Sequence, residues 1–215
     1  MKVLVVGASG GSGRAAVAAL LERGHDVAAL VRNPDSAGTL PAEVTIVTGD
    51  AVRLADVERA VQGRDAVVVT LGIRENPVRV RLRGPAHTPL DVRSRGTRTV
   101  MEAMRRHGVQ RLIVQTSYGT GPTRDRLPFR YRMMFRGLLG PQIVDTEQQD
   151  GLVRSSELDW TIVQPVNLTD DGDDRSGVLS DGDVAKWSVS RGAVGRVLAD
   201  LVDRPGCVGA TVAVS

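Results

Sequence analysis

The sequence predicts one α/β domain, a doubly wound parallel sheet flanked by helices on both faces. Apolar runs rich in valine alternate with stretches of helical spacing along the whole chain, and this order is typical of a parallel sheet. Several runs are continuously apolar, as in strands that are buried on both faces. The chain has 215 residues, of which 41% are hydrophobic and 25% charged, as in ordinary soluble globular proteins. Because neither repeats nor linkers divide the sequence, residues 1–215 are expected to form a single domain.

The expected strands are short runs rich in β-branched residues, followed by residues that favour turns. The first run stops at Gly7, the third at Gly49, and the sixth before Pro165. In chain order, strands are predicted at residues 2–6, 27–31, 44–47, 66–71, 112–115, 160–163 and 211–214.

The expected helices lie between these strands and have apolar residues at helical spacing. Gly24, Gly63 and Gly108 follow three of them, where glycine commonly ends a helix. Ser190 can cap the last one. Helices are predicted at residues 15–21, 54–61, 91–107, 145–156 and 193–202. The remaining stretches at 74–90, 119–144 and 168–188 are expected to be irregular.

A glycine-rich loop follows the first strand and precedes the first helix. In its G-x-x-G-x-x-G spacing, Gly7 can turn the chain, Gly10 leaves room for a pyrophosphate, and Gly13 lets the helix pack closely. The free amides at the start of the helix then face the anion, and the helix dipole helps to bind it. The alternative is a glycine-rich turn without a ligand. We predict a Rossmann-like dinucleotide-binding fold with cofactor contacts from Gly7, Ala8, Ser9, Gly10, Gly11, Ser12, Gly13 and Arg14.

The end of the second strand indicates which cofactor is bound. NAD-binding folds carry an acidic residue there, about 20 residues past the loop, to bind the ribose 2′-hydroxyl. This chain has Arg32 and Asn33 instead, and an arginine can pair with the 2′-phosphate of NADP. Arg14 can add a second positive charge. NADP(H) is therefore favoured over NAD(H), and the alternative is that Arg32 is only a solvated residue at a strand end.

Residues after the third and fourth strands are expected to flank the rest of the cofactor. Asp50 and Ala51 follow the third strand, where Asp50 could accept a hydrogen bond from the adenine amino group. Leu71 and Gly72 end the fourth strand, beside the phosphates and the ribose. Each of these residues could also be an ordinary turn residue.

Several short segments together resemble a known family. Residues 7–14, 31–33, 49–50, 116–117 and 158–165 are similar to those of the atypical short-chain dehydrogenase/reductases. More narrowly, the chain resembles the NmrA-like NAD(P)H-binding group that includes the flavin and biliverdin-IXβ reductases. The resemblance covers essentially the whole chain. It implies that a hydride passes directly from NADPH to a flavin or linear tetrapyrrole stacked over the nicotinamide.

The resemblance also implies which residues lie at the nicotinamide end of the cofactor. Ser117 matches the serine that ends the fifth strand in that family, and Asn167 stands where the family has a histidine. The segments 119–144 and 165–190 are expected to form the substrate-side region. Further cofactor contacts are expected from Thr116, Ser117, Pro165, Val166, Asn167 and Leu168.

The acid–base pair of the ketoreductases, Tyr-x-x-x-Lys, is absent. Pro122 and Phe135 stand where the lysine would follow Tyr118 and Tyr131. Ser117 and Tyr118 remain as catalytic candidates, Tyr118 as a proton donor with an ordinary pKa of ~10.

The function predicted from these residues is an NADPH-dependent oxidoreductase that transfers a hydride to a flavin, quinone or other conjugated acceptor. Such an acceptor needs little acid–base help, because the cofactor supplies the chemistry. One alternative is a non-catalytic NADP-binding redox sensor of the NmrA type. Another is an epimerase or ketoreductase-like biosynthetic enzyme.

The segment after the fifth strand contains most of the aromatic residues of the chain. An apolar, methionine-containing wall suits a flat substrate, while ordinary packing or a dimer contact is equally expected. The residues concerned are Tyr118, Phe129, Tyr131, Met133, Met134, Phe135, Leu138 and Leu139.

Charge and composition disfavour several other classes of protein. The net charge of +3 is small, and the 3% of aromatic residues are too few to stack single-stranded nucleic acid. The histidines are far apart, and the single Cys207 cannot form an internal disulfide or a cysteine cluster, so no metal is expected. No apolar run approaches the ~18 residues of a membrane span. We expect a cytoplasmic monomer or homodimer that binds a small-molecule acceptor, with neither nucleic acid nor membrane as a partner.

Two charged stretches have a simple expected role. The acidic residues Asp170, Asp171, Asp173 and Asp174 are predicted to form a solvated loop. The arginines between Arg74 and Arg98 could bind an anionic substrate, although a solvated face is favoured.

Overall fold

The main sheet of the protein contains eight strands. The computed structural model describes all residues except 74, 76–78, 80–82, 85, 87, 129–131, 134–139 and 171–178. Every predicted strand is confirmed, with ends that shift by at most a few residues. In chain order the strands of the main sheet are β1 (Lys2–Val6), β2 (Asp26–Val31), β3 (Thr45–Thr48), β4 (Ala66–Val69), β5 (Arg111–Gln115), β6 (Asp159–Pro165), β8 (Leu179–Ser180) and β10 (Ala210–Val214).

The order of the strands is that of a doubly wound sheet, β3-β2-β1-β4-β5-β6-β10-β8. The chain builds outward from β1 through β2 to β3, and then returns to the other side of β1 with β4. In such folds, ligands bind outside the carboxyl ends of the strands at this reversal. Only the edge departs from the prediction of a parallel sheet, because β8 pairs antiparallel with β10.

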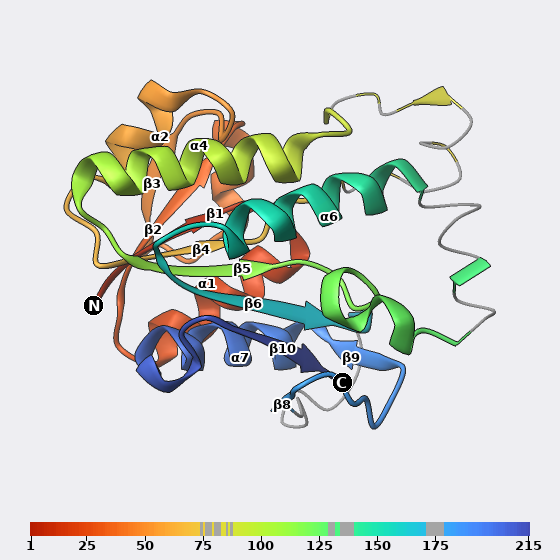
Figure 1. Ribbon diagram of the computed structural model, residues 1–215. Helices are drawn as coiled ribbons and strands as arrows, with labels where there is room; N and C mark the ends of the chain where they lie inside the picture. Colours follow the sequence, from red (N-terminus) through yellow and green to blue (C-terminus); the bar gives the residue numbers. More distant parts are fainter. Residues whose placement is uncertain are drawn as a thin grey trace.

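Helices cover both faces of the sheet, as predicted (Figure 1). One face carries α1 (Gly11–Glu22) and α7 (Arg191–Asp203), and the other carries α2 (Leu54–Val61), α4 (Val92–His107) and α6 (Gly140–Arg154). The predicted cap of α7 is confirmed, since Ser190 Oγ accepts a hydrogen bond from the Ala193 amide at 3.0 Å. No helix within the described ranges combines the length and the apolar character that a membrane crossing would require.

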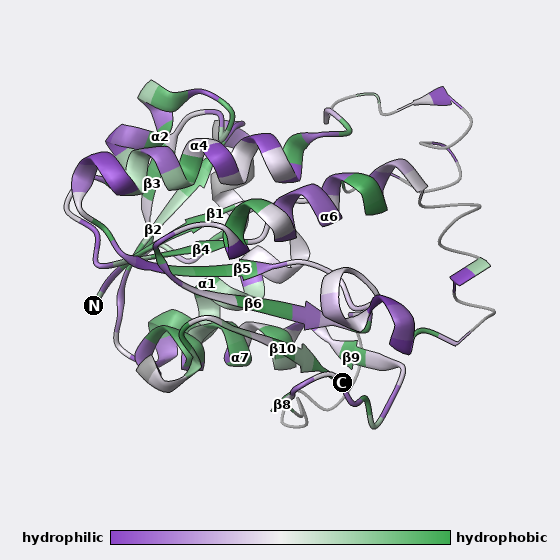
Figure 2. Ribbon diagram, viewed as in Figure 1, coloured by the Kyte–Doolittle hydropathy of each residue, from purple (hydrophilic) through white to green (hydrophobic). Residues whose placement is uncertain are grey.

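Two hydrophobic clusters lie on opposite faces of the sheet, and the central strands between them are coloured as hydrophobic in Figure 2. Because side chains alternate along a strand, Val3 and Val5 join the cluster with α1 and α7. Leu4 and Val6 join the cluster with α2 and α4. All of these strand residues are fully buried, which explains why the strands are visible in the sequence as uninterrupted apolar runs.

The stretches predicted to be irregular contain short elements that the sequence did not reveal. A second, two-stranded parallel sheet joins β7 (Asn167–Thr169) to β9 (Ser188–Ser190). The remaining elements are the 3₁₀ helices η1 (Pro34–Thr39), η2 (Gly121–Arg126) and η3 (Pro205–Cys207), and α6 begins five residues before its predicted start, at Gly140. A strand pair as short as β7 and β9 forms because of contacts with other parts of the chain rather than because of local propensity.

Part of the predicted apolar wall and of the acidic run lies outside the described residues. This holds for Phe129, Tyr131, Met134, Phe135, Leu138, Leu139, Asp171, Asp173 and Asp174.

Candidate functional site

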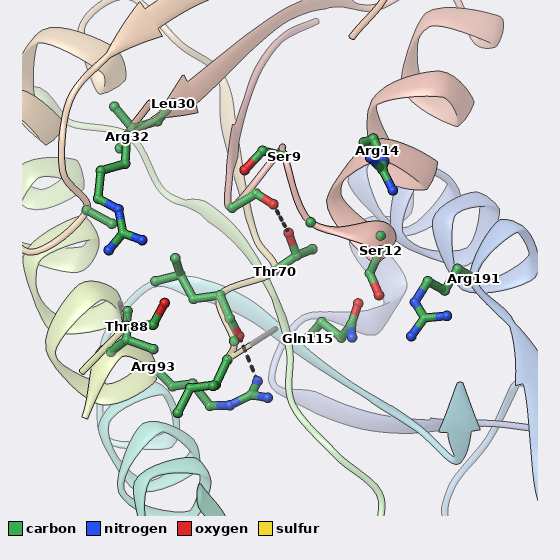
Figure 3. A pocket seen from close by; sticks show the side chains of 18 of the residues that line it. Ser9, Ser12, Arg14, Leu30, Arg32, Thr70, Thr88, Arg93, Gln115 and Arg191 are labelled. Carbon is green, nitrogen blue, oxygen red and sulfur yellow. Dashed lines mark hydrogen bonds between the residues drawn. The ribbon is translucent and has the colours of Figure 1, made fainter. Parts of the chain in front are cut away.

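A cleft of about 630 Å³ opens at the carboxyl ends of the central strands (Figure 3). Residues of the glycine loop, of the ends of β2, β3, β4 and β5, and of the starts of α4 and α7 line it. Of the residues predicted to bind a cofactor, the cleft brings together Gly7, Ser9, Gly10, Gly11, Ser12, Arg14, Arg32, Asp50, Ala51, Leu71, Gly72 and Leu168.

The glycine loop is shaped by contacts that leave no space for side chains. Gly7 has a φ of +90°, which L side chains rarely adopt, and a Cβ there would lie 2.8 Å from the Thr70 carbonyl oxygen. The Gly10 amide donates to the Gly7 carbonyl oxygen at 3.0 Å. A Cβ on Gly13 would lie 2.2 Å from that same Gly7 oxygen. The conformational roles expected of Gly7 and Gly13 are therefore those found in the structure.

The start of α1 points at the cleft without a side-chain cap. Gly10 occupies the N-cap position and offers no side-chain acceptor, and no acidic residue lies in the first turn. Gly11 and Ser12, in this first turn, both line the cleft. Backbone amides at an uncapped helix start, together with the helix dipole, form a site for an anion.

One end of the cleft is formed by the residues that follow β2 and β3. Arg32 is exposed, and its side chain lines this end beside Leu30 (Figure 3). Asp50 Oδ1 accepts a hydrogen bond from the Val52 amide at 3.1 Å, as in a local turn. The Asp50 amide donates to Asp56, and this hydrogen bond is the main reason why the pKa of Asp56 is lowered. Asp50 therefore lines the cleft while one of its oxygens holds its own turn.

The other end of the cleft contains residues that the sequence reasoning missed. Gln115 is the last residue of β5, is 7% exposed, and has no partner for its buried Oε1 among the described residues. Arg191 begins α7 and pairs with Asp170 at 2.6 Å, and its Cδ would lie 2.6 Å from a Cβ on Gly11. Gln115 could have been found from the rule that ligands bind at the carboxyl ends of the strands. The capping serine just before Arg191 marks a second helix start at the same edge.

Arg93, one of the arginines between Arg74 and Arg98 that could bind an anionic substrate, belongs to the first turn of α4. Its Nη1 donates to the Leu71 carbonyl oxygen at 2.7 Å (Figure 3). Burial lowers the pKa of Arg93, and the nearby Asp145 opposes this effect. Asp145 in turn accepts from the Arg93 and Ser94 amides at 2.9 and 3.1 Å, so α6 supplies the cap of α4.

Several predicted contact residues do not line the cleft. Ala8 and Val166 are buried in the core next to α1 and α7, and Asn33 Oδ1 accepts from the Asp35 amide at 3.0 Å in a local turn. Asn167 is exposed on β7. The remaining predicted positions outside the lining are Gly13, Thr116, Ser117, Tyr118 and Pro165.

Tyr118 has a packed environment. It is 4% exposed, its hydroxyl donates to the Gly182 carbonyl oxygen at 2.9 Å, and its ring meets Trp187 edge-on at 5.8 Å. Burial raises the pKa of Tyr118. These contacts favour a packing role for Tyr118 over the proton donation suggested from the sequence, because the hydroxyl proton is already directed to a backbone oxygen.

The residues of the cleft fit a dinucleotide. The loop is a cradle that side chains at Gly7 and Gly13 would fill, the start of α1 offers free amides to a pyrophosphate, and the orphaned Gln115 oxygen can accept from an amide. Together with the strand order, these features define a Rossmann-type nucleotide-binding protein. No group of histidine, cysteine, aspartate and glutamate within the described ranges could hold a metal ion.

Comparison with known proteins identifies the family. The model of the family described as NAD(P)H-binding matches residues 7–205. The chain belongs to this NAD(P)H-binding family, and its cofactor is a nicotinamide nucleotide. The resemblance to the NmrA-like atypical short-chain dehydrogenase/reductases is thereby confirmed.

Individual relatives show how far the likeness extends. An uncharacterized chloroplastic protein of Arabidopsis thaliana is 28% identical, over 94% of this chain and 71% of its own length. A 3-beta-hydroxysteroid dehydrogenase of Mycolicibacterium neoaurum is 35% identical, over 54% of this chain and 32% of its own length.

Solved structures share the fold over the whole chain. A Bacillus halodurans protein assigned as an NAD-dependent epimerase/dehydratase superimposes with a TM-score of 0.77 at 28% identity, covering 100% of this chain and 93% of that one. ChuY, an anaerobilin reductase from Escherichia coli O157:H7, gives a TM-score of 0.80 at 22% identity, covering 100% and 96%. At that identity, the second likeness is evidence for the fold alone.

Proposed function

We propose that the protein is an NADPH-dependent oxidoreductase that transfers a hydride to a flavin, quinone or other conjugated acceptor. One observation carries this proposal: within the described part of the chain, the residues that line the cleft include no tyrosine, lysine, histidine or cysteine. The cleft therefore offers backbone amides, arginines and amide groups for binding. Its carboxylates already accept hydrogen bonds, Asp50 from the Val52 amide, Glu75 from the Ala86 amide and Asp170 from Arg191. A conjugated acceptor suits such a site, because the reduced cofactor supplies the hydride and water can supply the proton.

The name of one relative supports a reductive role. A 3-diazoavenalumate denitrifying reductase of a Streptomyces species is 34% identical over 54% of this chain and 38% of its own length. This name describes a reduction, which agrees with the reductive role proposed.

NADPH is the proposed cofactor because of the charge at the end of β2. Arg32 lies in the lining, Arg14 lies beside the glycine loop, and no acidic residue occurs in the Leu-Val-Arg-Asn segment that ends β2. An arginine there can form charge-assisted hydrogen bonds with a 2′-phosphate.

Within this proposal, different residues contact different parts of the cofactor. The glycine loop and the start of α1 bind the pyrophosphate, Asp50 and Ala51 flank the adenine, and Leu71 and Gly72 flank the ribose. Gln115 orients the carboxamide of the nicotinamide, at the end of the cleft opposite the adenine. For Thr116, Ser117 and the segment 165–168, contact with the nicotinamide end stays a prediction, as does the substrate-side role of 119–144 and 165–190.

The proposal is tested by following the absorbance of reduced nicotinamide with purified protein, NADPH and a panel of flavins and quinones. The expected result is oxidation of NADPH that requires both protein and acceptor and that Gly10→Val abolishes. Gly38→Ala, at a glycine with open space around it, is the control and should leave the rate unchanged. A panel that gives no protein-dependent oxidation at all would exclude the proposal.

The second candidate is a redox sensor that binds the nicotinamide nucleotide without turnover. The lack of tyrosine, lysine, histidine and cysteine among the described lining residues, and the engaged hydroxyl of Tyr118, favour it over an epimerase, which needs an acid–base pair. A sensor must bind oxidised and reduced cofactor with different affinities. Calorimetric titration with NADP⁺ and NADPH tests this, and equal affinities would remove the basis for a sensor.

A further inference from the structure

The cleft contains arginines on several elements, and one of them lies apart from the elements that suit the cofactor phosphates. Arg14 adjoins the glycine loop, and Arg32 follows β2. Arg191 lies over Gly11 and already has a carboxylate partner in Asp170. Arg93 instead comes from the first turn of α4 and lines the cleft (Figure 3), where it contacts Leu71, which follows β4.

The guanidinium of Arg93 is held in place with part of its donor capacity unused. Its Nη1 donates to the Leu71 carbonyl oxygen at 2.7 Å. A Cβ on Gly72 would lie 3.0 Å from Nη2, so the glycine makes room for the side chain. Within the described part of the chain, this is the single hydrogen bond of the side chain, which forms no ion pair there. Because a guanidinium carries a planar fork of N–H donors, several of them remain for a ligand in the cleft.

Glu75 lines the same cleft, where its carboxylate accepts from the Ala86 amide, and no carboxylate of the described residues forms an ion pair with Arg93. Burial lowers the pKa of Arg93, and Asp145 is the carboxylate whose charge raises it. That carboxylate accepts from the Arg93 and Ser94 amides and from Ser94 Oγ, so it is committed to the start of α4. An arginine stays charged when it is desolvated, and the cost of desolvation is offset when an anion binds it. A fork of donors matches the paired oxygens of a phosphate or carboxylate.

We propose that Arg93 forms a subsite for an anionic group, a phosphate or carboxylate, that the acceptor carries. This inference rests on the proposed function and narrows its acceptors to anionic ones. The other source of a phosphate is the cofactor itself, so the experiment has to separate acceptor binding from cofactor binding.

The test compares ligands that differ only in an anionic group. FMN and riboflavin are one such pair, and a naphthoquinone with and without a sulfonate is another. Binding to NADP⁺-saturated protein is measured by fluorescence quenching or calorimetry, without turnover. Arg93→Met removes the charge and keeps most of the side-chain length. Arg95→Met is the matched control, because Arg95 is exposed on the same helix and pairs with Asp91 at 3.6 Å.

The expected result is that wild type binds the anionic member of a pair more tightly than the neutral one. Arg93→Met should weaken binding of the anionic member by about 10- to 100-fold, the loss of a charge-assisted hydrogen bond. Binding of the neutral member and of NADPH should stay unchanged, and Arg95→Met should change neither. Thermal unfolding checks that each variant is folded. If Arg93→Met does not fold, Arg93→Lys keeps the charge without the fork and should give a smaller loss for the anionic member.

The other outcomes show which of the two proposals, the subsite or the oxidoreductase, fails. Equal affinities for both members of each pair, or equal losses for both in Arg93→Met, exclude the subsite. A loss of NADPH affinity in Arg93→Met assigns the residue to the cofactor instead. Binding with the expected discrimination but without oxidation of NADPH would leave the subsite standing and exclude the oxidoreductase. If no member of either pair binds, both proposals fall together.

Discussion

The glycine loop after β1 and the loop after β5 lie at the same edge of the sheet, yet different forces hold them. The first is closed by backbone hydrogen bonds between near neighbours, from Gly10 to Gly7 at 3.0 Å and from Arg14 to Gly10 at 2.9 Å. The second, residues 116–128, is held by side chains that come from α6 and β6.

The polar network around the second loop connects distant parts of the chain. Asp150 Oδ2 accepts from Thr120 Oγ1 at 3.0 Å and from Gln164 Nε2 at 3.2 Å. Thr123 Oγ1 donates to Gln164 Oε1 at 2.7 Å. All four residues are buried. The first loop therefore depends on the absence of side chains, and the second depends on their presence. Adding a side chain should disturb the first loop, whereas removing a polar group should disturb the second.

The largest effect is expected at Gly13. A Cβ there would lie 2.2 Å from the Gly7 carbonyl oxygen and 2.8 Å from the Ala8 Cα, and both are backbone atoms that cannot rotate away. Gly13→Ala should lower the free energy of unfolding by about 3 kcal/mol, at the upper end of overpacking effects. NADPH binding should be lost with it. Urea denaturation and nucleotide titration measure the two effects.

Gly151 in α6 is the control for this substitution, because a Cβ there meets nothing within 4 Å. Gly151→Ala should stabilise the protein by about 0.5–1 kcal/mol, since alanine favours a helix. If Gly13→Ala were as well tolerated as Gly151→Ala, backbone closure would not explain the first loop.

The second effect concerns the charge beside the first loop. If Arg32 binds the 2′-phosphate, Arg32→Ala removes a charge-assisted hydrogen bond worth about 1.5–3 kcal/mol, or about 10- to 100-fold in NADPH affinity. NADH affinity should hardly change, because NADH has no such phosphate. Arg32→Asp should invert the preference, since a carboxylate repels the phosphate and accepts from a free 2′-hydroxyl.

Titration of each protein with both nucleotides gives the answer. Gly10→Val should weaken both nucleotides alike, because its side chain would occupy the approach of the pyrophosphate. Arg98→Ala, on the exposed side of α4, should weaken neither. Equal affinities of wild type for NADH and NADPH, unchanged in Arg32→Ala, would rule out the NADP preference but not the dinucleotide site.

The contrast between the loops also explains what the sequence could predict. Strands such as β1 and β4 were predictable because both of their faces are buried, and the glycine loop because its rules are local. Gln115, Arg93 and Arg191 enter the cleft from β5, α4 and α7, so only the folded chain brings them together. The pairing of β8 with β10 depends on a single short contact at the sheet edge and leaves no pattern in the sequence.

The third effect tests a cap that lies outside its own helix. Asp145→Ala removes the acceptor of the Arg93 and Ser94 amides and should cost about 1–2 kcal/mol, as other lost N-caps do. Asp91 immediately precedes α4 but its side chain makes no capping hydrogen bond. Asp91→Ala should therefore cost less than about 0.5 kcal/mol, as surface changes usually do. Denaturant midpoints compare the two, and a larger loss for Asp91→Ala would contradict the cap from α6.

The smallest effect depends on pH and concerns Asp150. Its burial raises its pKa above the ordinary 3.8, although hydrogen bonds from Thr120 and Gln164 and the charge of Arg154 act against this. The folded protein thus holds this proton at pH values where the unfolded chain has lost it. Stability from the protonated carboxyl is complete below pH 3.8 and declines as the pH rises through the raised pKa.

Asp150→Asn imitates the protonated form and cannot ionise. Relative to wild type, it should therefore gain stability as the pH rises through this window, after which the difference stays constant. Thr120→Val removes a hydrogen bond that lowers the pKa, so it should move the upper end of the window to higher pH. Urea midpoints of the three proteins across a pH series measure these differences. A difference between Asp150→Asn and wild type that is independent of pH, or that grows toward acid, would show that Asp150 is ionised in the network and that its charge helps to hold the second loop.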